Sequence, residues 1–218
     1  MVLTKQKIQL DHPACPAALR QAMQQAGVSA VWTLGNTAIL EAPLLGLFCS
    51  QKCPGDLIIR TFDTIRQLRD AGVPVIGGFH APMEKECLDL LLRGTQPVVV
   101  CPARSIEGMR VPDDWKPPLA EGRLLVLSLF KGKRNRRMTT ELAQARNRFV
   151  SLLASAVLMP YATPGGATEG LCRGLLASGT RVYTLDSEHN SHLIEIGAEK
   201  TMPARISEIM DDLAAYEL

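Results

Sequence analysis

Short runs of β-branched and other apolar residues alternate with helical patterns from residue 44 onward, and this alternation constrains the fold more than any other feature. Strands separated by helices build parallel sheets that are covered on both faces. The sequence therefore predicts an α/β fold, a Rossmann-like, doubly wound, mostly parallel sheet with helices on both faces. The expected strands are 44–49, 73–78, 97–101, 124–129, 156–161 and 181–185.

The helical segments have recognisable ends. Apolar residues recur at helical spacing over 56–71, and the pattern stops at Gly72. The next helix, about 82–93, begins with Pro82 and ends at Gly94, the usual order of these two residues in a helix. Residues 105–121 contain three prolines and predict a long connection with little regular structure. Further expected elements are helices at 14–26, 168–177 and 203–216 and a short strand at 30–34.

A length of 218 residues suits one domain with short extensions. We expect an N-terminal extension over 1–42, the Rossmann-like domain over 43–200 and a C-terminal helix over 201–218. No stretch approaches the roughly 20 apolar residues of a membrane span, and the amino end does not lead into a signal-peptide core. The sequence predicts a cytoplasmic protein with no membrane partner.

The six cysteines suggest no disulfide framework, because no secretory signal accompanies them. We expect them to be reduced and mostly buried. Zinc is the alternative, and Cys49 and Cys53 are the one pair with near-ligand spacing. No second pair or histidine cluster would complete a tetrahedral site, so we predict no metal and no cofactor.

Positive charge is concentrated in one segment. Residues 131–148 carry seven Lys or Arg against one acid, so this segment has a local charge of +6 and the remainder carries −4. Such a segment can neutralise several phosphates, or it can be a solvated loop that aids solubility. The basic run at its start consists of Lys131, Lys133, Arg134, Arg136 and Arg137.

Small and polar residues follow several predicted strands. Ligands of doubly wound sheets bind beyond the carboxyl ends of the strands, so these residues are the first candidates for a site. Glycines where a strand meets a helix amino end can bind phosphate, although a tight turn explains the same sequence. The candidates are Ser50 after the first strand, Gly77, Gly78 and His80 after the second, and Pro164, Gly165, Gly166 and Thr168 after the fifth.

Arg146 decides where the following helix should begin. In one continuous helix over 139–154, Arg146 would lie near the middle of the apolar face, an expensive place for a charge. We therefore predict that the packed helix begins close to Arg146. Arg146, Asn147 and Arg148 would then stand at a helix amino end, which attracts anions. Together with the glycine loops, this favours a phosphate-bearing ligand.

Catalysis has no positive support in the sequence. No Ser-His-Asp order, Walker lysine loop or paired catalytic carboxylate can be assembled by spacing. His80 can be a general base, but a lone loop histidine is more often a hydrogen-bonded polar group. We expect Glu84 and Glu86 to be solvated. No catalytic residue is therefore predicted.

Four motifs follow one another along the chain: Phe48–Gly55, Val75–His80, Arg146–Ala154 and Asn190–Ala198. Their order and spacing resemble the Rossmann-like domain of the DNA-processing protein A family (DprA, also called Smf), part of the SLOG superfamily. The resemblance covers about residues 35–198. The most specific match is Arg-Asn-Arg followed by an apolar helix.

The resemblance implies a domain that binds single-stranded DNA, dimerises and passes the strand to the RecA recombinase during natural transformation. It implies that the basic run adds phosphate contacts. It also shows two departures, since Gln51 stands where the family has arginine and His80 begins a sequence that lacks the family's second-loop arginine. The ligand pocket that the resemblance nominates consists of Ser50, Gly77, Gly78, Arg146, Asn147 and Arg148.

A second branch of the superfamily gives the alternative hypothesis. Pro164-Gly165-Gly166 with Thr168 and Glu169 resembles the Pro-Gly-Gly-x-Gly-Thr loop of the lysine-decarboxylase-like (LOG) branch, which hydrolyses nucleoside monophosphates. The loop lacks the second glycine, so that branch's catalytic Arg and Glu have no matching positions. The alternative function is a sensor or hydrolase of a small nucleotide-derived ligand.

Overall fold

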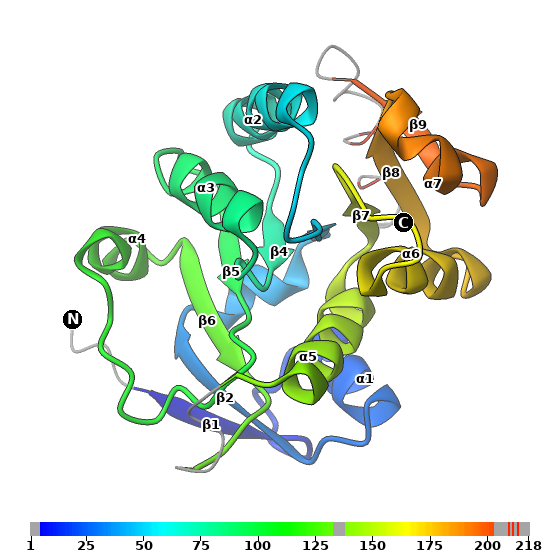
Figure 1. Cartoon of the computed structure of the whole chain (residues 1–218). Helices are drawn as coiled ribbons and strands as arrows, with labels where there is room; N and C mark the ends of the chain where they lie inside the picture. The colour runs from blue at the N-terminus through cyan, green and yellow to red at the C-terminus, as the bar shows by residue number, and fades with distance from the viewer. Residues whose placement is uncertain (1–4, 133–137, 203–208, 210, 212, 214–218) are drawn as a thin grey trace.

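The computed structural model describes residues 5–132 and 138–202, together with residues 209, 211 and 213. Within them the chain forms one nine-stranded sheet in the order β1-β2-β6-β5-β4-β3-β7-β8-β9 (Figure 1). Neighbours from β6 to β9 are parallel, whereas β1 and β2 pair antiparallel to their neighbours. The strands are β1 Gln6–Gln9, β2 Ala30–Gly35, β3 Leu45–Leu47, β4 Val75–Gly77, β5 Val98–Val100, β6 Leu124–Ser128, β7 Ala156–Leu158, β8 Arg181–Leu185 and β9 Glu199–Thr201.

The strands expected from β2 to β8 are confirmed, and two edge strands were missed. In β1 only Ile8 is buried, and in β9 only Thr201 is buried. Edge strands need no continuous apolar run, because fewer neighbours cover them. Residues of the segment 1–42 contribute β1, β2 and the helix α1 to the same sheet and core.

Helices cover both faces of the sheet, as expected for a doubly wound fold (Figure 1). The expected connection 105–121 contains η2 (Asp113–Trp115) and α4, so it is more regular than predicted. The described residues of the expected last helix, Ile209, Asp211 and Leu213, are helical. The helices are α1 Ala17–Gln25, α2 Gly55–Asp70, α3 Pro82–Leu91, α4 Lys116–Ala120, α5 Thr140–Leu153, α6 Ala167–Ala177 and α7 Ser191–Glu195.

Two hydrophobic clusters, one on each face, hold the layers together. On one face α1, α5 and α6 bury side chains such as Met23, Phe149 and Cys172. On the other face α2, α3 and α4 bury side chains such as Ile65 and Leu91. Burying each large apolar side chain stabilises the fold by about 1.5–3 kcal/mol. No helix in the described part of the chain is long and apolar enough to cross a membrane.

The prediction that the packed helix begins near Arg146 is wrong. Helix α5 is continuous from Thr140, and the Thr139 hydroxyl oxygen accepts a hydrogen bond from the Leu142 N–H at 3.3 Å. An N-cap threonine is a sufficient start signal, because it satisfies one of the unpaired amides of the first turn. Arg146 therefore lies inside the helix, and only 5% of its surface is exposed.

Candidate nucleic-acid interface

The strand order reverses at β3, which lies between β4 and β7. The chain runs outward in one direction through β4, β5 and β6, and then in the other through β7, β8 and β9. Crevices of doubly wound sheets form beyond the carboxyl ends of the strands at this kind of reversal. The loops after β3, β4, β5 and β7 therefore frame the candidate site.

Arg146 lies directly over the loop that follows β4. Its Nη1 donates a hydrogen bond to the Cys101 carbonyl oxygen, just after β5, at 3.0 Å. A methyl group on Gly78 would overlap the guanidinium, so the absence of a side chain at Gly78 creates the space that Arg146 fills. The structure thus brings Arg146 and Gly78 together, as the sequence predicted, but from the middle of a helix rather than from its start.

The charge of Arg146 has little internal compensation. Within the described residues it forms no ion pair, and its Nε has no hydrogen-bond partner although that atom is buried. Burial lowers the pKa of Arg146, and the nearby Glu84 carboxylate partly offsets this. A guanidinium stays protonated even so, because its ordinary pKa exceeds 12. A fixed positive charge therefore lies at the carboxyl ends of β4 and β5.

Glu84 ties two loops of the crevice together, a role that we did not predict. Its carboxylate accepts hydrogen bonds from the backbone N–H of Cys49 at 3.0 Å, His80 at 2.9 Å and Ala81 at 3.3 Å. It is 6% exposed, whereas Glu86 is exposed. The expectation that Glu84 is solvated is therefore wrong. Its position in the first turn after Pro82 was the available signal, since a glutamate at the third helical position reaches back to the cap.

The backbone of the β4 loop is itself unusual. Phe79 has a φ of 46°, and it is the one residue other than glycine with positive φ among the described residues. Such a conformation is disfavoured for a bulky residue and often marks a functional segment. It turns the chain so that Gly77 ends β4 and His80 reaches the surface.

A cleft of about 650 Å³ opens beside this loop. Its walls come from the β4 loop, α3 and the connection 102–115. The charged groups on its lining are Lys85, Arg104 and Arg110, with Asp89 as the acid. Partial burial and the charges of Lys85, Arg146 and Arg104 lower the pKa of His80, which also lines the cleft. Apolar contacts come from Phe79, Met109, Trp115 and Met138.

Of the basic run, the structure describes Lys131 alone. Lys131 is exposed, and Met138 lies on the cleft lining just after the run. The other four residues predicted for phosphate binding lie outside the described residues, namely Lys133, Arg134, Arg136 and Arg137.

Asn147 and Arg148 face a different groove. This groove, of about 830 Å³, lies between α5 and α6, and both residues line it together with Gly170 and Gly174. Arg148 is exposed there. Arg146 and Arg148 are two positions apart on α5. Because successive residues of a helix point about 100° apart, the two side chains lie on nearly opposite faces and cannot enter one pocket. The structure therefore separates Arg148 from Arg146.

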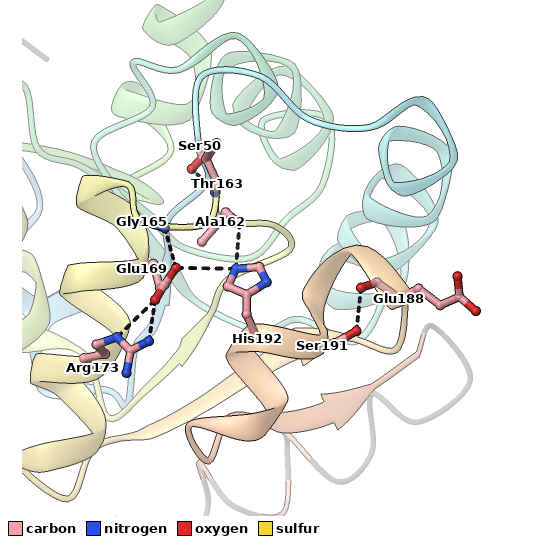
Figure 2. A network of polar contacts seen from close by, with 9 residues as sticks. All are labelled: Ser50, Ala162, Thr163, Gly165, Glu169, Arg173, Glu188, Ser191 and His192. Atoms are coloured by element: carbon pink, nitrogen blue, oxygen red, sulfur yellow. Dashed lines mark hydrogen bonds and ion pairs between the residues drawn. The ribbon is translucent and has the colours of Figure 1, made fainter.

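Ser50 links the ends of β3 and β7. Its N–H donates to the Tyr161 carbonyl at 3.1 Å, and its hydroxyl oxygen accepts from the Thr163 N–H at 2.9 Å (Figure 2). Ser50 is buried. Its polar groups therefore connect the segment after β3 to the segment after β7.

The glycine loop after β7 is occupied by the protein's own carboxylate. Glu169 accepts a hydrogen bond from the Gly165 N–H at 2.7 Å and from Arg173 Nη2 at 2.6 Å (Figure 2). The Arg173 hydrogen bonds and the Gly165 amide lower the pKa of Glu169. His192 Nε2 lies 3.9 Å from the same carboxylate and 3.0 Å from the Ala162 oxygen. Gly166 is the N-cap of α6, Pro164 precedes it in the loop, and Thr168 lies in the first turn of the helix.

The predicted residues thus fall into separate places. Gly78 and His80 line the cationic cleft, Arg146 lies against Gly78, and Gly77 ends β4. Ser50 and the β7 loop form the neighbouring network of Figure 2. Within the described residues, no group of three or more His, Cys, Asp or Glu could hold a metal ion.

Comparison with known proteins supports the fold. No family model and no curated protein matches the sequence. The DNA processing protein A (DprA) structure from Streptococcus pneumoniae matches 90% of this chain and 71% of its own, with TM-score 0.72 and 16% identity. A Helicobacter pylori DprA structure, described for its single-stranded DNA binding mode, matches 97% of this chain and 98% of its own, with TM-score 0.73 and 15% identity.

Molybdenum cofactor carrier proteins share the fold at greater distance. The carrier from Chlamydomonas reinhardtii matches 79% of this chain and 99% of its own, with TM-score 0.53 and 11% identity. At such identities the likeness concerns the fold. The expected DprA-like, Rossmann-like fold is confirmed.

Proposed function

We propose that this chain binds single-stranded DNA in the cationic cleft between the β4 loop, α3 and the connection 102–115. The observation that carries the proposal is the buried guanidinium of Arg146, which has no ion-pair partner within the described residues, beside a cleft lined by Lys85, Arg104 and Arg110. The DprA fold supports it, because a solved protein with that fold binds single-stranded DNA. The basic run, next to Met138, would extend the phosphate contacts beyond the cleft.

The chemistry of the lining suits a single strand. Proteins that bind single strands combine a positive groove, which follows the phosphates, with aromatic faces on which bases stack. Here Arg104 and Arg110 supply the charge, and Trp115 lies on the same lining. Arginine pairs with phosphate through two parallel hydrogen bonds, so two arginines can fix a backbone segment.

The salt dependence of oligonucleotide affinity tests the proposal. On a single strand, log K falls with log salt concentration by about 0.7 for each phosphate neutralised. Arg104→Gln and Arg110→Gln should each weaken binding and reduce that slope by about 0.7 if each contacts one phosphate. Arg66→Gln is the matched control, because Arg66 is an exposed arginine on α2 that does not line the cleft. Equal slopes for all variants and the parent protein would contradict the proposal.

A small phosphorylated nucleotide is the second candidate ligand, for a sensor or a hydrolase. The cleft volume of about 650 Å³ favours it, since ligand pockets usually measure about 300–1,000 Å³. A nucleoside monophosphate at about 100 times its Kd would stabilise the fold by about 2.7 kcal/mol. A rise in Tm with mononucleotides and none with oligonucleotides would favour this candidate, and free base in the mixture would identify a hydrolase.

Two finer proposals rest on the resemblance to DprA. We propose that the protein acts as a homodimer and that it delivers the strand to a RecA-like recombinase in DNA recombination. Light scattering of the purified protein tests the first. The second predicts faster assembly of recombinase filaments on DNA that this protein has already bound, and an unchanged assembly rate would contradict it.

A further inference from the structure

One acid lines the cationic cleft, and phosphate binding gives it no role. Among the described residues of the lining, Asp89 is the only carboxylate, whereas Lys85, Arg104 and Arg110 carry positive charge. A carboxylate repels the phosphates that these cations attract, so it lowers the affinity for a polyanion unless it meets a group that donates hydrogen bonds. Asp89 therefore restricts which ligands suit the cleft.

Asp89 has no ion-pair partner inside the described part of the chain. It lies on α3, one turn after Lys85, yet it pairs neither with Lys85 nor with any other described cation. Its side chain remains exposed at the cleft. Partial burial and the carboxylates of Glu86 and Asp114 raise its pKa, while Arg93 lowers it. The carboxylate oxygens are thus available to accept hydrogen bonds from a ligand.

An aromatic ring lies on the same lining. Trp115, at the end of η2, is half-buried and packs against the hydrophobic cluster that also contains Leu88, the neighbour of Asp89 on α3. An indole ring offers a face on which a nucleobase stacks, and a carboxylate offers acceptors to the edge of a base. The cleft thus combines both kinds of contact, and its volume of about 650 Å³ accommodates a nucleotide.

Guanine is the nucleobase whose edge matches a carboxylate. Its Watson–Crick edge presents N1–H and the exocyclic amino group side by side, so each oxygen of one carboxylate can accept a hydrogen bond. In adenine and cytosine the amino group stands next to a ring nitrogen that is itself an acceptor. In thymine the single N–H lies between two carbonyl oxygens. These edges are accessible in single strands, whereas in a duplex they are paired.

We propose that Asp89 makes the cleft selective for guanine, as a base in a single strand or as a free guanine nucleotide. The inference rests on the proposed function, because the cations of the lining must hold the phosphate that the base carries. Asp89 accepts two parallel hydrogen bonds from the base, and Trp115 stacks on its ring. Guanine should be preferred by about tenfold over each other base, which is in the lower part of the range for one bidentate contact.

Oligonucleotides with a single base test the selectivity. Each probe is an abasic strand with one central base, so all probes carry the same phosphates and differ only in guanine, hypoxanthine, adenine, cytosine or thymine. Fluorescence anisotropy at one salt concentration gives the Kd of each probe. We expect guanine to bind most tightly. Hypoxanthine keeps N1–H but lacks the amino group, so its affinity should lie between those of guanine and the other bases.

Two variants assign the preference to Asp89. Asp89→Asn replaces one acceptor by a donor, so it should remove the guanine preference without weakening the binding of the thymine probe. Glu86→Gln is the matched control, because Glu86 is an exposed acid on α3 that does not line the cleft, and it should keep the preference. Equal affinities for all bases in the parent protein, or a guanine preference that persists in Asp89→Asn, would overturn the proposal.

The outcomes separate this inference from the proposed function. If all probes bind equally and their affinity falls with salt, the strand-binding function stands and the guanine selectivity is refuted. Thermal unfolding with guanosine or inosine monophosphate distinguishes the two sources of the base. A larger rise in Tm with the guanosine nucleotide, without binding of any probe, would assign the selectivity to a free nucleotide. If neither kind of ligand binds, both proposals are overturned.

Discussion

Two glycine loops at the same edge of the sheet differ in whether the charge beside them is paired with an opposite charge. In the loop after β4, Gly78 leaves space for the Arg146 guanidinium, which has no paired carboxylate within the described residues. In the loop after β7, the Gly165 amide and Arg173 both bind the Glu169 carboxylate (Figure 2). The first loop keeps a positive charge available, while the second satisfies its donors internally. Paired glycines after a strand are therefore not by themselves evidence of a ligand site.

The two arginines differ in how strongly solvent screens their charge. Arg146 is buried, so its field extends into the neighbouring cleft with little screening. Arg173 is 57% exposed and already paired, so solvent and Glu169 both weaken its field. We expect an anion to prefer the β4 loop for this reason, and substitutions at both loops test the comparison.

Gly78→Ala should have the largest effect. The added methyl group overlaps the Arg146 guanidinium and must expel it from its site, which should destabilise the protein by about 3 kcal/mol. Combining it with Arg146→Ala should cost less than the sum of the single changes, because the overlap is then gone. Denaturant unfolding of the four proteins measures both quantities.

Gly165→Ala is the matched comparison for Gly78→Ala. Gly165 has a φ of 70° and open space around its missing Cβ, so alanine suffers backbone strain alone. That strain costs about 1–2 kcal/mol. Two outcomes would contradict this reading: equal stabilities of the two alanine variants, or additive losses of stability in the double variant at 78 and 146. Either would mean that the missing side chain at Gly78 is not what makes room for Arg146.

Glu84→Gln should have an intermediate effect. The carboxylate accepts hydrogen bonds from three backbone amides, and an amide side chain cannot accept them all with the same strength. The substitution also removes the negative charge that lies near Arg146. Hydrogen bonds to a charged group contribute about 1.5–3 kcal/mol, so we expect a loss of about 2 kcal/mol.

Glu86→Gln on the same helix is its control, since Glu86 is exposed. Exposed substitutions usually stay within about 0.5 kcal/mol. Urea unfolding at neutral pH distinguishes the two variants. Equal stabilities would mean that the hydrogen bonds from the β3 and β4 loops to Glu84 contribute nothing to the free energy of unfolding.

The fold was largely readable from the sequence because its central strands are buried on both faces. Such strands appear as unbroken apolar runs, as at Val98–Val100 and over 124–127. The edge strands β1 and β9 carry mostly polar residues and leave no such trace. Periodicity reports burial, so it finds the core elements and misses those that are held mainly by backbone hydrogen bonds.

The candidate site was only partly readable. Sequence order placed Gly78 and Arg146 at one crevice, but the cost of burying a charge argued wrongly against a continuous α5. That cost is offset by the Cys101 carbonyl and by the space at Gly78, both distant in sequence. The same limitation hid Glu84, whose partner Cys49 lies in another loop. Local patterns identify which residues are polar, whereas only the tertiary structure shows what satisfies them.

The smallest effect should come from the Glu169 carboxylate, and it depends on pH. The Arg173 hydrogen bonds and the Gly165 amide lower its pKa in the folded state, so the unfolded chain binds the proton more readily. This contribution to stability is complete above the ordinary carboxyl pKa of about 4.3 and is lost as pH falls through the folded pKa. Glu169→Gln lacks it at every pH. The Tm difference between parent and variant should therefore be present at pH 7 and shrink below about pH 4.3, and Arg173→Gln should shrink it likewise. If the Tm difference grew on acidification, the Gly165 amide and Arg173 would not stabilise the ionised Glu169 carboxylate, and the comparison between the two loops would fail.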